Sequence, residues 1–219
     1  MGPDATGKTE PRDRAVLAVL SHGLRAEEVV NLNLDDFDGI RLTIRMAKDD
    51  STGTVPLGRD ARDCLTQYIS DRRKIEPSEP DAPMFLAYGR NRKGQRLGYQ
   101  GIYYLVKALG QRAAKQAQWL LEQRQLQEEV NAEELNFWQH LSEVELEEIR
   151  RLEAVHPHQL RHTFATGLLL RGMDSFHART LTRHKSESSF KRYAKRAMMV
   201  AAEQAFFRAL GEEAPTSMT

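Results

Sequence analysis

The longest stretch of this 219-residue chain without a glycine or a proline runs from residue 111 to residue 156. It is rich in Gln, Glu, Leu and Ala, most of which have good helix propensity. This length and composition predict one long helix, or two helices separated by a break near Val130-Asn131. From about Tyr99 the chain carries helical patterns almost to its C-terminus, so we expect its second half to be helical.

The same stretch is acidic, with five basic and ten acidic residues and a net charge of −5. The remaining chain has 27 basic and 21 acidic residues, a net charge of +6. Its basic residues concentrate in residues 156–196 and 88–98. A charged run is most often a solvated surface face. Two basic runs flanking an acidic block nevertheless predict a basic body that carries an acidic helical insertion, which we assign to residues 110–155.

The N-terminal part of the chain has the pattern of a small antiparallel sheet. Apolar and polar residues alternate from Ile40 to Met46, and residues 54–57 supply the return strand of a β-hairpin. Residues 84–86 are short enough to form a third strand. We therefore expect a mainly α fold with a small antiparallel β-sheet, in the α+β class. The expected helices begin near Thr9 and cover residues 25–32, 59–74, 99–155, 158–170, 174–182, 187–193 and 197–210.

Composition narrows the class of protein further. Forty per cent of the residues are hydrophobic, which is enough for one domain with a real core over residues 1–219. No apolar run approaches the roughly 18 residues of a membrane span. The single cysteine, Cys64, excludes a disulfide framework and fits a reducing cytosol. We expect a cytoplasmic protein that makes no membrane contact.

Motifs for metal, nucleotide or hydrolytic chemistry are missing. The sequence has no HExxH pair, no cysteine cluster and no GxxxxGK[ST] loop. The sequence offers no third residue that would orient the Ser21-His22 pair as a nucleophile and its base, so it gives little support to a hydrolase activity. His156, His158 and His162 lie close in sequence, but a metal site would need further ligands beside them. We expect neither a metal nor another cofactor.

Two sequence boxes carry a family resemblance. Residues 156–172, HPHQLRHTFATGLLLRG, resemble the H-x-L-R-H-[TS]-[FA]-A-T box of the tyrosine site-specific recombinases, also called the phage integrase family. Residues 23–28, GLRAEE, resemble the G-L-R-x-x-E box of that family, and residues 31–37 match the L-x-x-x-D that follows it. The resemblance implies the fold of a recombinase catalytic domain.

Three further positions extend the resemblance in the same order along the chain. Lys48 lies seven residues before the V-P-L of residues 55–57, as the hairpin lysine of the family does. Residues 181–184, LTRH, match the family's L-G-H, and Tyr193 follows His184 at the family's nine-residue spacing. The similarity covers about residues 10–195, apart from the insertion.

The resemblance implies that Tyr193 attacks a DNA phosphodiester and forms a 3′-phosphotyrosyl link with a free 5′-hydroxyl. The transition state concentrates negative charge on the non-bridging oxygens. Arg25 and Arg161 suit those oxygens, because a guanidinium stays charged and can bind two oxygens side by side.

The other family positions would move protons or orient groups. Lys48 is the candidate general acid for the 5′-oxygen, and His158 is the candidate base or proton relay for the tyrosine. His184 would hydrogen-bond a non-bridging oxygen. Glu28, one helical turn after Arg25, would orient that turn or the neighbouring histidine.

Some features depart from the family pattern. Arg183 stands where the family usually has a glycine, the 110–155 insertion is unusually long, and we expect no counterpart of the family's N-terminal core-binding domain in residues 1–219. We expect double-stranded DNA as the partner, a homo-oligomer on DNA through a C-terminal helix at residues 197–211, and a protein partner for the insertion. The candidate DNA-contacting residues are Arg90, Arg92, Lys93, Arg96, Arg183 and Lys185.

The function predicted from the sequence is site-specific DNA recombination by strand cleavage and rejoining, in a bacterial, phage or archaeal nucleoid. A type IB topoisomerase-like or resolvase activity uses the same chemistry and stays open. A catalytically silent DNA-binding or interaction module, with the acidic helices as its working part, is a third possibility, against which the complete set of site residues argues.

Overall fold

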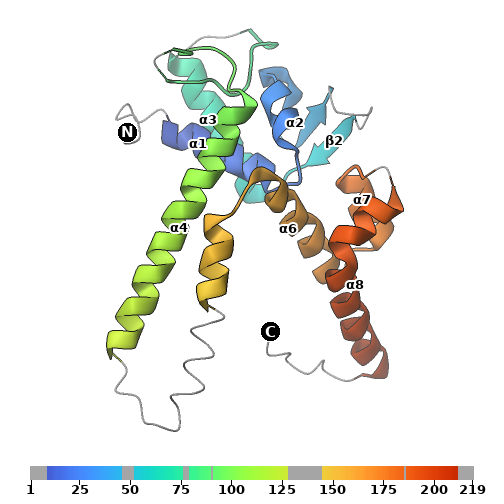
Figure 1. Cartoon of the computed structure of the whole chain (residues 1–219). Helices are drawn as coiled ribbons and strands as arrows, with labels where there is room; N and C mark the ends of the chain where they lie inside the picture. Colours follow the sequence, from blue (N-terminus) through green and yellow to red (C-terminus); the bar gives the residue numbers. More distant parts are fainter. Residues whose placement is uncertain are drawn as a thin grey trace. The chain divides into compact units, whose positions relative to one another are not determined.

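The computed structural model describes residues 9–45, 52–75, 79–89, 91–127, 145–184 and 186–211 (Figure 1). It divides the chain into two compact units. The first unit combines residues 1–99 with residues 158–219, and the second comprises residues 100–157. No helix in the described part of the chain is both long and apolar enough to cross a membrane.

Helices α1 (Thr9–Leu20) and α3 (Arg59–Ile75) pack against each other in the first unit. The buried residues of α1 recur at helical spacing, with Ala15 and Val16 one turn before Val19 and Leu20. Leu65 and the largely buried Tyr68 of α3 belong to the same core. The short helix α2 (Ala26–Asn31) follows α1 after a tight turn and is continued by the 3-10 helix η1 (Leu34–Asp36).

The predicted β-hairpin is confirmed. Strand β1 (Arg41–Ile44) pairs antiparallel with β2 (Gly53–Pro56), and the buried Leu42 lies opposite the buried Val55. The fold class predicted from the sequence, mainly α with a small antiparallel sheet, is therefore correct. Lys48 lies in the connection between the strands, outside the described residues.

The expected third strand at residues 84–86 is wrong. The sheet of the described residues has two strands, and this region contributes only isolated bridges, one of which joins Leu86 to Arg96. Side chains donate hydrogen bonds to backbone carbonyls that would otherwise pair with a neighbouring strand. The hydroxyl of Tyr68 and a guanidinium N–H of Arg72 donate to Met84 O, at 3.0 and 2.8 Å, and Arg12 donates to Leu86 O at 3.0 Å.

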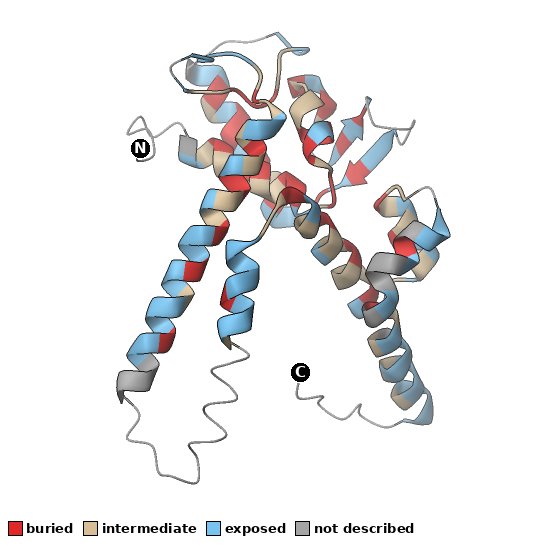
Figure 2. Cartoon of the chain, in the orientation of Figure 1, coloured by how far each residue is buried: buried red, intermediate tan, exposed pale blue. Residues whose placement is uncertain are grey.

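Three helices complete the first unit: α6 (Pro157–Leu170), α7 (Ser175–Leu181) and α8 (Glu187–Leu210). A buried cluster holds them together, formed by Ala165, Leu169, Ala178, Phe190 and Ala197. The expected division of the last helix into residues 187–193 and 197–210 is wrong, because α8 is continuous. No glycine or proline lies within residues 187–210, which is consistent with one uninterrupted helix. Its C-terminal half is mostly exposed (Figure 2).

The second unit contains helix α4 (Tyr99–Gln127) from residue 100 onward, and a helical segment at residues 145–153. Ala114, Leu121 and Ile149 form a small buried cluster between them. Gly110 permits the close approach, because a Cβ at this position would lie 2.3 Å from the carbonyl oxygen of Leu152. The break expected near Val130-Asn131 lies outside the described residues.

Gly23, in the turn between α1 and α2, has a φ of +81°. A Cβ there would lie 2.6 Å from Cδ1 of Phe164 on α6. The glycine therefore meets two requirements, a left-handed backbone and a close contact between the α1–α2 turn and α6.

We expect Gly23→Ala to lower the free energy of unfolding by about 2–5 kcal/mol, from left-handed strain of about 1–2 kcal/mol and overpacking of about 1–3 kcal/mol. Gly39→Ala is the matched control, because Gly39 has a φ of +93° and a Cβ added to it would meet no atom within 4 Å. The free energy of unfolding of this control should fall only by the part that comes from left-handed strain. Urea denaturation measures both, and equal losses would contradict the role given to the Phe164 contact.

Candidate active site

Arg161 of α6 lies at the centre of the candidate site, with only 1% of its surface exposed. Its Nη1 donates a 2.5 Å hydrogen bond to the carbonyl of Gly23, and its Nη2 donates to the carbonyl of Thr182. One side chain thereby ties α6 to the α1–α2 turn and to the end of α7. The sequence predicts a guanidinium presented to a phosphate, but here both terminal nitrogens bind backbone carbonyls.

A second arginine lies at the start of α2. The Nη1 of Arg25 donates to Oε1 of Glu28 at 2.7 Å, and the backbone N–H of Arg25 donates to Oε2 at 2.8 Å. Glu28 is 1% exposed, whereas 29% of the Arg25 side chain is exposed. The buried carboxylate thus holds an arginine that is still accessible from solvent.

Arg183 joins the same carboxylate from the turn after α7. Its Nη2 lies 2.5 Å from Oε2 of Glu28, and its side chain is 7% exposed. Burial lowers the pKa of Arg183, the Glu28 carboxylate raises it, and the charge of Arg25 lowers it again. Glu28 therefore lies between two guanidinium groups that repel each other.

His184 follows Arg183 and packs against Phe190 of α8, with ring centroids 5.6 Å apart. Its Nδ1 lies 2.7 Å from the hydroxyl of Thr182, which also lies 2.8 Å from the carbonyl of Ala178. A carbonyl only accepts, so the single hydroxyl proton points to Ala178 and the hydroxyl oxygen accepts from Nδ1–H. The network assigns the proton of neutral His184 to Nδ1.

Burial, which contributes most, and the positive charges of Arg161 and Arg25 together lower the pKa of His184 from its ordinary value of 6.5 to about 3. The neighbouring His162 and His158 add to this effect. In the free protein His184 is neutral at pH 7.

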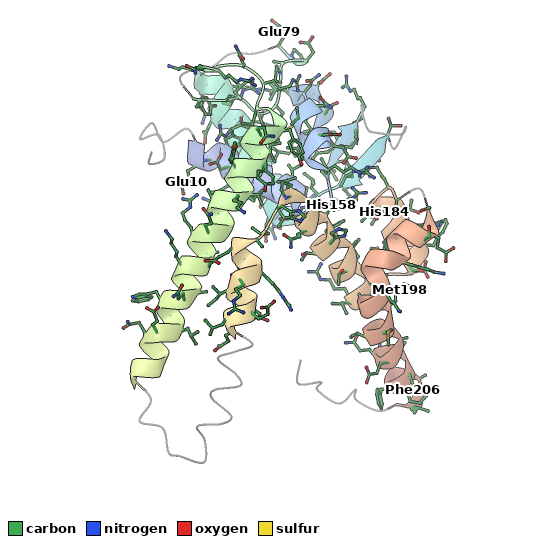
Figure 3. All side chains as sticks on the ribbon, in the orientation of Figure 1. Glu10, Glu79, His158, His184, Met198 and Phe206 are labelled. Carbon is green, nitrogen blue, oxygen red and sulfur yellow. The ribbon has the colours of Figure 1, made fainter. Side chains whose placement is uncertain are left out.

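His158 occupies the first turn of α6 and is exposed; Figure 3 labels it together with His184. Its ring contacts that of His162 edge to face, with centroids 4.3 Å apart. Pro157 begins the helix, where its missing N–H costs no hydrogen bond and its ring favours helical φ. This start places the His158 position at the same end of α6 as Arg161.

Tyr193 and Lys48 complete the set expected from the sequence. Tyr193 belongs to α8, three residues after Phe190 and four before Ala197, the two residues of α8 in the buried cluster. Its side chain, like the whole of Lys48, lies outside what the structure describes.

Two of the expected DNA-contacting residues make internal hydrogen bonds, and their contact with DNA stays a prediction. Arg96 donates to the carbonyls of Val30 and Leu32, at 2.8 and 3.0 Å, and so caps the end of α2. Arg183 is buried against Glu28. Both internal bonds have the same reason: a guanidinium with several donors satisfies buried acceptors well. Arg92 and Lys93 are exposed, and Arg90 and Lys185 lie outside the described residues.

The sequence analysis did not identify the contact of Thr182 with His184 or the ion pair between Arg183 and Glu28. Thr182 is fully buried and sets the proton position on His184, but a threonine in a helix-end motif carries no distinctive signal. For Arg183 the available signal is its place at a position where the family usually has a glycine, a residue that favours left-handed backbone. Among the described residues, no three His, Cys, Asp or Glu side chains gather where they could hold a metal ion.

The balance of charge describes what the site can bind. Arg25 and Arg183 bind one carboxylate, Glu28, Arg161 binds the carbonyls of Gly23 and Thr182, and the nearby His184 is neutral. The excess positive charge is held by hydrogen bonds at fixed positions, with Arg25 facing solvent in part. Such an arrangement suits an anion with several oxygens, such as a phosphodiester.

The low pKa of His184 predicts a pH-dependent stability. The unfolded chain binds a proton at His184 near pH 6.5, whereas the folded chain does so only near pH 3. Acid therefore favours the unfolded state, and the contribution of His184 to unfolding free energy falls as the pH drops from about 6.5 towards 3. Urea denaturation at pH 7 and pH 5 should show a larger loss for wild type than for His184→Gln. Equal losses would contradict the buried, neutral histidine.

Comparison with known proteins shows the family of this chain. The sequence model described as the phage integrase family matches residues 4–199. The tyrosine recombinase XerC of Pseudomonas fluorescens is 30% identical over 165 residues, which is 74% of this chain and 41% of that protein. XerD of Bifidobacterium longum is 29% identical over 194 residues, 85% of this chain and 51% of the relative. The chain thus spans about half the length of the curated relatives it matches.

Solved structures share the fold. The XerA recombinase superimposes with a TM-score of 0.60 at 20% identity, over 93% of this chain and 58% of the other. The XerH site-specific recombinase bound to its palindromic difH substrate gives a TM-score of 0.56 at 19% identity, over 96% of this chain and 48% of the other. With the family model matching nearly the whole chain, this protein belongs to the phage integrase family of tyrosine recombinases.

Proposed function

We propose that this chain is the catalytic part of a site-specific recombinase that cleaves and rejoins double-stranded DNA. The observation that carries the proposal is the cluster of Arg25, Arg161, His158 and His184, which the first unit assembles from α2, α6 and the turn after α7. Its charge suits a phosphodiester, and Tyr193 lies on the helix that packs against this cluster through Phe190.

In the proposed reaction the phosphodiester enters beside Arg25, the more accessible arginine. A non-bridging oxygen then competes with the carbonyls of Gly23 and Thr182 for the N–H groups of Arg161. The exchange is favourable because a charged acceptor forms a stronger hydrogen bond than a neutral carbonyl. The negative charge of the phosphate also raises the pKa of His184, whose Nε2 can then take a proton and donate to a non-bridging oxygen.

The covalent step forms one bond and breaks another at phosphorus. The Oη of Tyr193 attacks the phosphorus and passes its proton to His158, and the bond to the 5′-oxygen breaks as Lys48 donates a proton to it. The products are a 3′-phosphotyrosyl link and a free 5′-hydroxyl. A second strand's 5′-hydroxyl reverses the step, so the bond is restored without an external energy source.

The proposal extends to protein partners. Met199, Phe206 and Leu210 are exposed on α8, and we assign them to contact with a second copy of the chain on DNA. Trp119 and Leu120 are exposed on α4 within the acidic insertion, and we assign them to a protein partner with a basic and apolar face. The single-domain organisation, with residues 110–155 as an insertion and residues 197–211 as an oligomer contact, belongs to this proposal.

A covalent adduct tests the chemistry directly. The protein is incubated with nicked duplexes of randomised sequence, in which cleavage releases a short fragment that cannot be rejoined, and is then denatured. We expect wild type to retain DNA covalently and Tyr193→Phe to retain none, because phenylalanine has no nucleophile. Sequencing the retained DNA identifies the preferred duplex.

Equal retention by the two proteins, or none by wild type on DNA that it binds, would contradict the proposal. Supercoiled plasmid separates the related activities. Relaxation of the plasmid without joining of two sites would indicate the topoisomerase-like alternative.

A further inference from the structure

We propose that Arg183 is a positioning residue that, through the Glu28 carboxylate, holds Arg25 against the turn that carries His184. The inference rests on the proposed function, because it names a residue that prepares the same site for a phosphate. Arg183 stands where the sequence resemblance leads one to expect a glycine, so the interaction is a feature of this chain.

The backbone shows why a glycine would be expected at this position. Thr182 caps α7, and Arg183 follows it with a φ of +53°, the one non-glycine residue with positive φ in the described part of the chain. The Arg183 N–H donates to Thr180 O at 3.0 Å, and the His184 N–H donates to Arg179 O at 3.2 Å. These two bonds form a Schellman motif, whose left-handed position favours glycine.

The side chain provides what a glycine could not. Its Nη2 binds Oε2 of Glu28, and burial protects this ion pair from solvent. Its stem reaches β2, because a Cβ added to Gly53 would lie 3.7 Å from Cδ of Arg183, an ordinary van der Waals distance. One residue therefore connects the start of α2, the end of α7 and the strand that follows the Lys48 connection.

The charge of Arg183 also matters to Arg25. Glu28 lies 2.7 Å from Arg25 and would by itself cancel much of the positive charge that a phosphate meets there. A second guanidinium on the same carboxylate offsets that negative charge while leaving Arg25 held in place. Removing Arg183 should thus weaken the stabilisation of the transition state and loosen Glu28, more than it weakens DNA binding as a whole.

Three variants separate charge from backbone strain. Arg183→Gly relieves the left-handed strain and removes the charge, Arg183→Gln keeps the strain and removes the charge, and Arg183→Lys keeps both. The exposed Arg14 of α1 serves as the charge control, as Arg14→Ala. Circular dichroism fixes a temperature at which every variant is folded.

The readouts are the single-turnover rate of adduct formation at saturating duplex and, separately, the Kd for that duplex. We expect Arg183→Gly and Arg183→Gln to react roughly 10- to 100-fold more slowly, as misplacement of a reacting group does. Arg183→Lys should regain most of the rate, Arg14→Ala should match wild type, and Kd should change little. A wild-type rate in Arg183→Gly, or a loss confined to Kd, would overturn the proposal.

A measurement on the free protein keeps this test separate from that of the proposed function. Nitrogen-15 relaxation of the Arg25 Nε–H should report a rigid side chain in wild type and in Arg183→Lys, and a more mobile one in Arg183→Gln. If wild type forms no Tyr193-dependent adduct, the proposed function fails and the relaxation data alone decide whether Arg183 holds Arg25. Equal rigidity in Arg183→Gln would overturn the positioning role.

Discussion

A guanidinium that is almost fully buried needs acceptors for its N–H groups, and Arg161 finds them in the backbone of two distant segments. Its bonds to Gly23 and Thr182 fix the α1–α2 turn and the end of α7 to one point on α6. Arg25 follows the first of these segments and His184 follows the second, so their places in the site depend on this one side chain. The glycine at position 23 is part of the same arrangement, because any larger residue would push the turn away from Phe164.

The second constraint is electrostatic. Two guanidinium groups cannot lie this close without compensation, and Glu28 supplies it as a buried carboxylate bonded to both Arg25 and Arg183. The compensation is incomplete, and the remaining positive charge helps to keep His184 neutral. A phosphate entering the site would accept hydrogen bonds from the arginines and favour protonation of His184. In the proposed function, the arginines are therefore in place before a phosphate enters, whereas His184 becomes positively charged only afterwards.

Much of this could be predicted from the sequence, since local patterns report local structure. The alternation from Ile40 to Met46 predicted the hairpin, and the lack of glycine and proline within residues 187–210 is consistent with one continuous α8. The third strand at residues 84–86 failed because Tyr68, Arg72 and Arg12, all distant in sequence, bind its carbonyls. The internal hydrogen bonds of Arg96 and Arg183 could not be predicted either. The sequence does not distinguish an arginine that faces DNA from one that binds a buried acceptor.

The most direct test of the central claim, that Arg25 and Arg161 converge on one phosphate, is a crystal structure of Tyr193→Phe bound to the duplex that wild type retains covalently. The claim predicts that non-bridging oxygens of a single phosphate accept hydrogen bonds from both guanidinium groups, with the ring at position 193 on the side opposite the 5′-oxygen. A structure in which that phosphate contacts neither arginine, with Arg161 still bound to Gly23 and Thr182, would contradict it.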